Sequence, residues 1–186
     1  MRIASSMLSV ALAVLTSTAG VHAVEMTRGR DPAAAMFERM HALAGDWTGT
    51  YEWSGGRTDA GSLRATYYVT GMGSALVEDL IIANNTPSMT TVYHLDGPDL
   101  RMTHFCAAQN QPRLKAAVID LESGLVNFSL VDVTNAVDHP SYVEGLSLHV
   151  VDADNLVLKF AFGGKSDKKA LETIVLRRVR ASSPSS

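Results

Sequence analysis

The chain has 186 residues, a single cysteine, and 16 lysines and arginines against 19 acidic residues, which gives a formal net charge of −3 at pH 7. A mildly acidic chain lacks the basic surface that binds nucleic acid or anionic membranes, and one cysteine forms no internal disulfide. The length suits one domain that can bury a hydrophobic core.

The first 23 residues carry the pattern of a secretory signal peptide. Arg2 precedes an apolar run from Met7 to Leu15, and small residues follow as far as Ala23. The run is shorter than the ~20 residues that span a bilayer. We therefore expect residues 1–23 to be cleaved, residues 24–30 to form a flexible tether, and the protein to be periplasmic or secreted, without a membrane span. A buried N-terminal helix is the alternative.

One short helix is expected next. Asp31 has the chemistry of an N-cap, and Pro32 suits the first helical position. Apolar residues then recur at helical spacing up to Gly45, which ends the helix: Met36, Phe37, Met40, Leu43 and Ala44. A single amphipathic helix of this length is expected to lie against a larger body.

From Gly45 onward the apolar pattern has a period of two, with turns rich in glycine, asparagine and aspartate. The predicted strands are 46–53, 62–70, 74–83, 88–95, 99–106, 113–120, 125–131, 145–151, 156–162 and 171–179. Ten short strands joined by tight turns predict an all-β fold, a single antiparallel up-and-down β-barrel that is either solid or holds one small ligand. The barrel domain is assigned to residues 31–180, and residues 181–186 to a disordered tail.

The hairpin around the turn Asp96–Asp99 can be interpreted by register. If Leu95 faces Leu100, alternate side chains of both strands share one largely apolar face. The side chains predicted to face the interior are Met89, Thr91, Tyr93, Met102, His104 and Cys106. A slip of one residue would reverse this assignment. The same reasoning, applied to the hairpin of the strands 145–151 and 156–162, directs His149 outward.

The segment Gly45-Asp46-Trp47-Thr48-Gly49, between the helix and the first strand, resembles the lipocalin and calycin superfamily. The resemblance implies that Gly45 and Trp47 close one end of the barrel, with Arg178 or Arg180 stacked on the indole. Gly49 and the count of ten strands look closer to nitrobindin-like and fatty-acid-binding-protein-like barrels. The segments 92–97, 103–106 and 110–113 are similar to segments of uncharacterised bacterial lipocalin-like proteins.

Nitrobindin-like proteins bind haem through a histidine late in the barrel. The late histidine of this chain, His149, is predicted to face outward, so His104 is the candidate for a haem or metal ligand. The sequence has no second cysteine, no His-x-His and no His-Glu-x-x-His to support a closed zinc site. No cofactor is predicted, and haem stays an alternative.

The candidate ligand-binding residues are Tyr93, His104, Cys106, Asn110 and Arg113. An inward histidine can hydrogen-bond a ligand or transfer a proton, and a nearby thiol is a soft ligand. Arg113, at the start of a strand, suits a bidentate bond to an anionic head group. The alternatives are a buried histidine satisfied by a neighbour, a cysteine that packs as a small apolar residue, and a plain turn with Arg113 in solvent.

These observations predict an exported barrel, monomeric or dimeric, that binds a small apolar or amphipathic molecule in its lumen. The first alternative is a haem- or metal-binding barrel that uses His104. An enzyme in the same cavity is a second alternative, although the sequence shows no Gly-x-Ser-x-Gly and no carboxylate pair placed for glycosidase chemistry. A module that binds a protein partner is the third.

Overall fold

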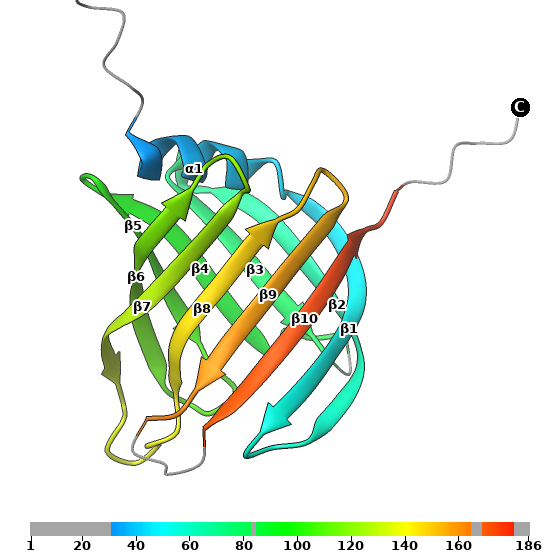
Figure 1. Cartoon of the computed structure of the whole chain (residues 1–186), viewed down its shortest axis with the longest axis vertical. Helices are drawn as coiled ribbons and strands as arrows, with labels where there is room; N and C mark the ends of the chain where they lie inside the picture. Colours follow the sequence, from blue (N-terminus) through cyan, green and yellow to red (C-terminus); the bar gives the residue numbers. More distant parts are fainter. Residues whose placement is uncertain (1–30, 83–84, 165–168, 181–186) are drawn as a thin grey trace, which may run out of the picture.

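The computed structural model describes residues 31–82, 85–164 and 169–180, so the predicted signal peptide, tether and tail lie outside the described residues. The described chain forms one short helix and ten antiparallel strands (Figure 1). Each strand pairs with the next in sequence, and β1 pairs with β10 to close the barrel. The predicted fold class is confirmed.

The helix α1 spans Pro32–His41. The strands are β1 (Gly45–Gly55), β2 (Asp59–Thr70), β3 (Ala75–Ile81), β4 (Met89–Asp96), β5 (Asp99–Phe105), β6 (Gln111–Asp120), β7 (Leu125–Thr134), β8 (Val143–Val150), β9 (Asn155–Phe162) and β10 (Ala170–Arg178). A 3-10 turn, η2 (Gly71–Gly73), joins β2 to β3. No helix in these three described ranges has the length and apolar character needed to cross a membrane.

Helix α1 lies across one end of the barrel, which we call the closed end (Figure 1). Asp31 caps it, because its side chain accepts a hydrogen bond from the Ala33 amide at 3.0 Å. The guanidinium of Arg39 donates to the carbonyls of Leu121, just after β6, and Val150, the last residue of β8. The helix is therefore fastened to the barrel by polar bonds at its edge and by apolar packing beneath it.

The predicted register of two hairpins is confirmed. Leu95 lies opposite Leu100 and Thr91 opposite His104 in the β4–β5 pair. Leu148 lies opposite Leu158 in the β8–β9 pair. Consequently His104 faces the interior, whereas His149 faces outward and its Nε2 lies 3.1 Å from the Ser123 carbonyl oxygen.

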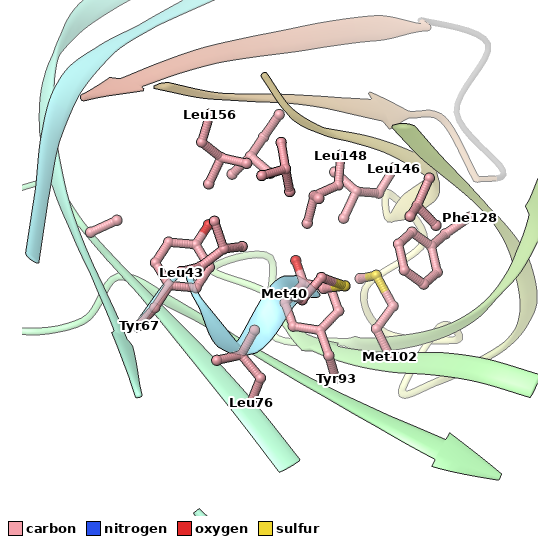
Figure 2. Close-up of a cluster of buried hydrophobic side chains, with 14 of the residues drawn as sticks. Met40, Leu43, Tyr67, Leu76, Tyr93, Met102, Phe128, Leu146, Leu148 and Leu156 are labelled. Atoms are coloured by element: carbon pink, nitrogen blue, oxygen red, sulfur yellow. The ribbon is translucent and has the colours of Figure 1, made fainter. Parts of the chain in front are cut away.

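The closed half of the barrel is filled with side chains (Figure 2). Met40 in the last turn of α1 and Leu43 just after the helix lie among side chains from strands on opposite sides of the barrel. Their labelled neighbours are Tyr67, Leu76, Tyr93, Met102, Phe128, Leu146, Leu148 and Leu156. The lumen is thus a packed core near α1, and any space for a ligand must lie toward the other end.

Candidate functional site

A cavity of about 610 Å³ lies at the end of the barrel opposite α1, where β1 ends and β2 begins. We call this the open end. The residues that line the cavity include Tyr51, Trp53, Met89, Cys106, Phe162 and Glu172, with Arg57 and Asp59 at the rim. Ligand pockets usually measure ~300–1,000 Å³ and are largely apolar with a few polar groups. The cavity meets both conditions.

Glu172 is the buried charged group of this cavity. It lies on β10, opposite Trp53 of β1 and Phe160 of β9, and only 1% of its surface is exposed. Its Oε2 has no hydrogen-bond partner among the described residues. Burial raises the pKa of Glu172 to about 7, against the opposing effects of the Arg57 charge and a hydrogen bond with Trp53. Near neutral pH this carboxyl can therefore either donate a proton in a hydrogen bond or carry a charge.

The Trp53 indole forms one wall of the cavity. Its ring lies 4.8 Å from the Phe162 ring, measured between centroids. The guanidinium of Arg57 lies over the Trp53 ring at 4.2 Å and also pairs with the Asp59 carboxylate at 2.9 Å. About half of the Arg57 side chain, 53%, is exposed. The wall is thus an aromatic surface with a solvated arginine resting on it.

Cys106 follows directly after β5 and lines the cavity. Its side chain is half-buried and forms no disulfide. Burial raises the pKa of the thiol, and the Glu172 charge acts in the same direction, so the thiol stays protonated at neutral pH. Cys106 therefore suits soft, polarizable contact with a ligand better than nucleophilic chemistry.

Tyr93 and His104 belong to a buried polar cluster below the cavity, and neither lines it. Glu78, fully buried on β3, accepts hydrogen bonds from the hydroxyls of Tyr67 at 2.6 Å and Tyr93 at 2.9 Å. The Thr91 hydroxyl donates to Glu78 at 3.4 Å and lies 2.9 Å from His104 Nδ1. The cluster joins the inner faces of four neighbouring strands, β2 to β5.

Burial shifts the pKa values of Glu78 and His104, at the two ends of this cluster, so that each residue favours its neutral form. It raises the pKa of Glu78 to about 7, although the hydrogen bonds from Tyr67, Tyr93 and Thr91 act to lower it. It lowers the pKa of His104 to about 4. The His104 ring packs 5.2 Å from the Phe160 ring, and its Nε2 has no partner among the described residues. At neutral pH His104 is therefore an uncharged buried side chain.

Asn110 lies behind the cavity wall and forms hydrogen bonds with the segment that includes the cavity-lining Ser141. Its buried Nδ2 donates to the carbonyls of His139 at 2.8 Å and Ser141 at 2.7 Å, and Ser141 lines the cavity. Arg113 lies elsewhere: its side chain is exposed on the outer face of β6, where its Nη2 donates to Asp132 of β7 at 2.7 Å. Of the five predicted binding residues, the structure places Cys106 at the cavity, Asn110 behind its wall, Tyr93 and His104 below it, and Arg113 outside the barrel.

Trp47 lies at the closed end. Its indole N–H donates to the Leu43 carbonyl at 2.9 Å, and the Arg178 guanidinium covers the ring at 4.3 Å. Arg178 also donates to the carbonyls of Ala42 and Ala44, just after α1. A Cβ at Gly45 would lie 3.1 Å from Arg178 Nη1, and its φ of +129° favours glycine. This arrangement joins the helix, the first strand and the last strand.

Sequence reasoning missed Glu172 and Trp53. The signal was present in the alternation of β10, where Glu172 has the same parity as the inward Ile174 and Leu176. A glutamate on the apolar face of a strand predicts a buried carboxyl. Trp53 has the same parity as Trp47 on β1, so an inward position followed from the same rule.

Neither His104 nor His149 is placed to hold haem in the cavity. His104, the predicted ligand, is completely buried, packs against Phe160 and does not line the cavity. His149 lies on the outer face. Within residues 31–82, 85–164 and 169–180, no three histidine, cysteine or acidic side chains come together as metal ligands.

No protein-family model and no curated protein sequence matches this chain. Among solved structures, it is similar to Rv2717c from M. tuberculosis, with 14% identity and a TM-score of 0.50, over 78% of this chain and 98% of that one. It is also similar to a DUF3598-family protein of unknown function from Nostoc punctiforme, with 14% identity and a TM-score of 0.53. That match covers 75% of this chain and 48% of the other, so this chain spans about half the length of that protein. At such identities the likeness shows a shared fold alone, a closed antiparallel barrel.

Proposed function

We propose that this protein is an exported binding protein that holds a small apolar or amphipathic molecule in the cavity at the open end of its barrel. The observation that carries the proposal is the coincidence of a cavity of about 610 Å³ with a buried carboxyl, Glu172, whose Oε2 lacks a partner. An unpaired buried polar atom is costly, and a ligand that supplies the missing partner recovers that energy.

The cavity offers an apolar surface to the body of the ligand and polar groups to its head. Trp53, Phe162 and Met89 offer apolar area for the body of the ligand. Glu172 offers a hydrogen bond or a charge for its polar end, and Cys106 a polarizable contact beside it. Burial of an apolar body supplies ~25 cal/mol for each Å² removed from water. The polar groups then select among molecules of similar size.

The filled half of the barrel gives the cavity a rigid floor. The helix α1 and the polar cluster around Glu78 occupy the interior toward the closed end, so a ligand meets packed side chains there. Preformed sites bind well because little conformational entropy is lost on binding. The arrangement supports a carrier in which one end of the barrel provides stability and the other provides binding.

A neutral fluorescent probe, N-phenyl-1-naphthylamine, tests the proposal. Its emission should rise on binding to the wild type and fall to near the background with Ala170→Trp, because Ala170 lines the cavity and an indole there would fill it. Ala161→Trp is the matched control: Ala161 is exposed on the outer face of the neighbouring β9. Thermal unfolding of both variants checks that each is folded. Equal probe binding by the two variants would refute the proposed site.

Export is proposed from the signal-peptide pattern of residues 1–23. Expression of the full chain in a Gram-negative host should place the protein in the periplasmic fraction with Val24 as its first residue. Intact-mass measurement of that fraction checks the cleavage. Full-length protein retained in the cytoplasm would refute export without bearing on the binding proposal.

A further inference from the structure

The charges at the cavity do not balance. Among the described residues, three charged side chains line it, and two of them, Arg57 and Asp59, pair with each other at the rim, where their side chains are 53% and 41% exposed. The third, Glu172, is 1% exposed and has an unpartnered Oε2. The unpaired charge that these described residues contribute is therefore negative and lies in the buried part of the site.

The wall beside Glu172 is suited to a cation. Trp53 lies directly opposite Glu172 on the paired strands, and Phe162 and Tyr51 extend the aromatic surface. Aromatic faces carry negative potential and attract ammonium and guanidinium groups. The Arg57 guanidinium already lies 4.2 Å from the centroid of the Trp53 ring, which shows that a cation rests on this indole.

Three classes of amphipathic ligand can be compared at this site. A carboxylate would meet the like charge of Glu172 in a poorly hydrated place. A neutral alcohol would offer a hydrogen bond but would leave a carboxylate without a counter-charge. An ammonium group offers both a donor and the opposite charge, and a buried charge is tolerated when it is paired and hydrogen-bonded.

We propose that the ligand is an amphipathic amine, whose ammonium group pairs with the Glu172 carboxylate while its apolar body lies against Trp53 and Phe162. This inference rests on the binding function proposed above and narrows it to one class of molecule. Arg57 pairs with Asp59 at the rim, and its charge lowers the pKa of Glu172 by less than burial raises it, so it compensates the carboxylate only in part.

Amine binding should depend on pH in a defined direction. The groups that face Glu172 are Arg57 in the turn after β1, Asp59 at the start of β2, Trp53 on β1, and Cys106 after β5. The carboxyl has a pKa of about 7, and it must lose its proton before it can pair with an ammonium group. Below pH 7 the apparent affinity should therefore fall by about tenfold for each pH unit.

Titration calorimetry with octylammonium, 1-octanol and octanoate tests the inference, because these probes share one alkyl chain and differ in the head group. At pH 8, octylammonium should bind the wild type at least about tenfold more tightly than 1-octanol does, and octanoate should bind most weakly. Glu172→Gln should lose that tenfold advantage and the pH dependence, while its affinity for 1-octanol changes by less than about twofold. Glu52→Gln, an exposed glutamate on the outer face of β1, should behave as the wild type.

The outcomes separate the two proposals. If 1-octanol binds as tightly as octylammonium, or if Glu172→Gln keeps the preference for the amine, the amine inference is overturned and the binding function stands. Tighter binding of octanoate would overturn the inference too. If none of the three probes binds while N-phenyl-1-naphthylamine also gives no signal, the binding function fails, and the inference with it.

Discussion

Each end of this barrel holds a tryptophan beneath an arginine. Trp47 and Trp53 lie on the same face of β1, and the guanidinium groups of Arg178 and Arg57 cover their rings at 4.3 Å and 4.2 Å. The surroundings differ. Arg178 is only 20% exposed and donates to the carbonyls of Ala42 and Ala44, whereas Arg57 is 53% exposed and pairs with Asp59, a nearby side chain in the same hairpin.

The same pairing of a tryptophan with an arginine therefore has a different role at each end of the barrel. The difference arises because α1 lies only at the closed end. At the closed end the residues after α1 present backbone carbonyls that hold Arg178 in place, so the stack becomes part of the core. At the open end the partner of Arg57 is a solvated carboxylate, and a surface ion pair of this kind is weak. The first stack stabilises the fold, and the second can rearrange when a ligand enters the cavity.

Replacing each tryptophan by alanine gives the strongest test of this difference. Trp47→Ala should reduce the free energy of unfolding by about 3–5 kcal/mol, because a fully buried indole in a packed layer leaves a cavity behind. Trp53→Ala should cost at least about 2 kcal/mol less, since its ring already borders an open cavity. Urea denaturation followed by far-UV circular dichroism measures both values. Equal losses would show that the two ends are equally important for stability.

The pH dependence of stability tests the buried carboxyl at the open end. The pKa of Glu172 is about 7 in the folded protein against 4.5 for an ordinary glutamate, so the folded state holds this proton more tightly. The resulting stabilisation is complete below pH 4.5 and is lost as the pH rises through 7, a change of about 3 kcal/mol. Glu172→Gln should remove this contribution.

The comparison is made between the wild type and Glu172→Gln at pH 4.5 and pH 7.5. Glu78 changes stability in the same direction as Glu172, and His104, whose pKa is about 4, in the opposite one. Both effects are common to the two proteins and cancel in the difference. If the free energies of unfolding of the wild type and of Glu172→Gln changed in parallel from pH 4.5 to 7.5, Glu172 would be well hydrated in the folded protein.

Replacing each arginine in turn by alanine should give a smaller difference in stability between the two ends of the barrel. Arg178→Ala should cost about 2 kcal/mol, because it leaves backbone carbonyls after α1 without donors and uncovers Trp47. Arg57→Ala should cost less than about 1 kcal/mol, as expected for an exposed ion pair. Thermal denaturation of both variants measures the difference. A larger loss with Arg57→Ala would contradict the view that its stack is loosely held.

The smallest difference in stability is expected when a tyrosine hydroxyl is removed from the buried Glu78 cluster or from the cavity wall. Tyr93→Phe removes one donor from the buried Glu78 and should cost about 1–1.5 kcal/mol. Tyr51→Phe, at the half-buried cavity wall, should change stability by less than about 0.5 kcal/mol. Chemical denaturation at pH 8, where Glu78 is largely ionised, is the appropriate measurement. Equal effects would indicate that the Glu78 cluster contributes no more than a cavity-lining hydroxyl does.

The fold could be predicted from the sequence because its main signals are local. Alternation with period two, glycine-rich turns and the Leu95–Leu100 pairing specify which side chains of a strand face inward. They placed Tyr93 and His104 inside, as the structure does. They also predicted the helix start, where Asp31 caps α1.

Only the closed barrel decided how deep each inward residue lies and what it meets there. His104 faces inward as predicted, yet contacts across the lumen with Phe160 of β9 bury it below the cavity. Arg113 is engaged by Asp132 of the neighbouring β7, and Glu172 becomes part of the cavity because closure brings β10 beside β1. The direction of a side chain follows from its own strand, whereas its depth and partners depend on strands distant in sequence and on where α1 fills the interior.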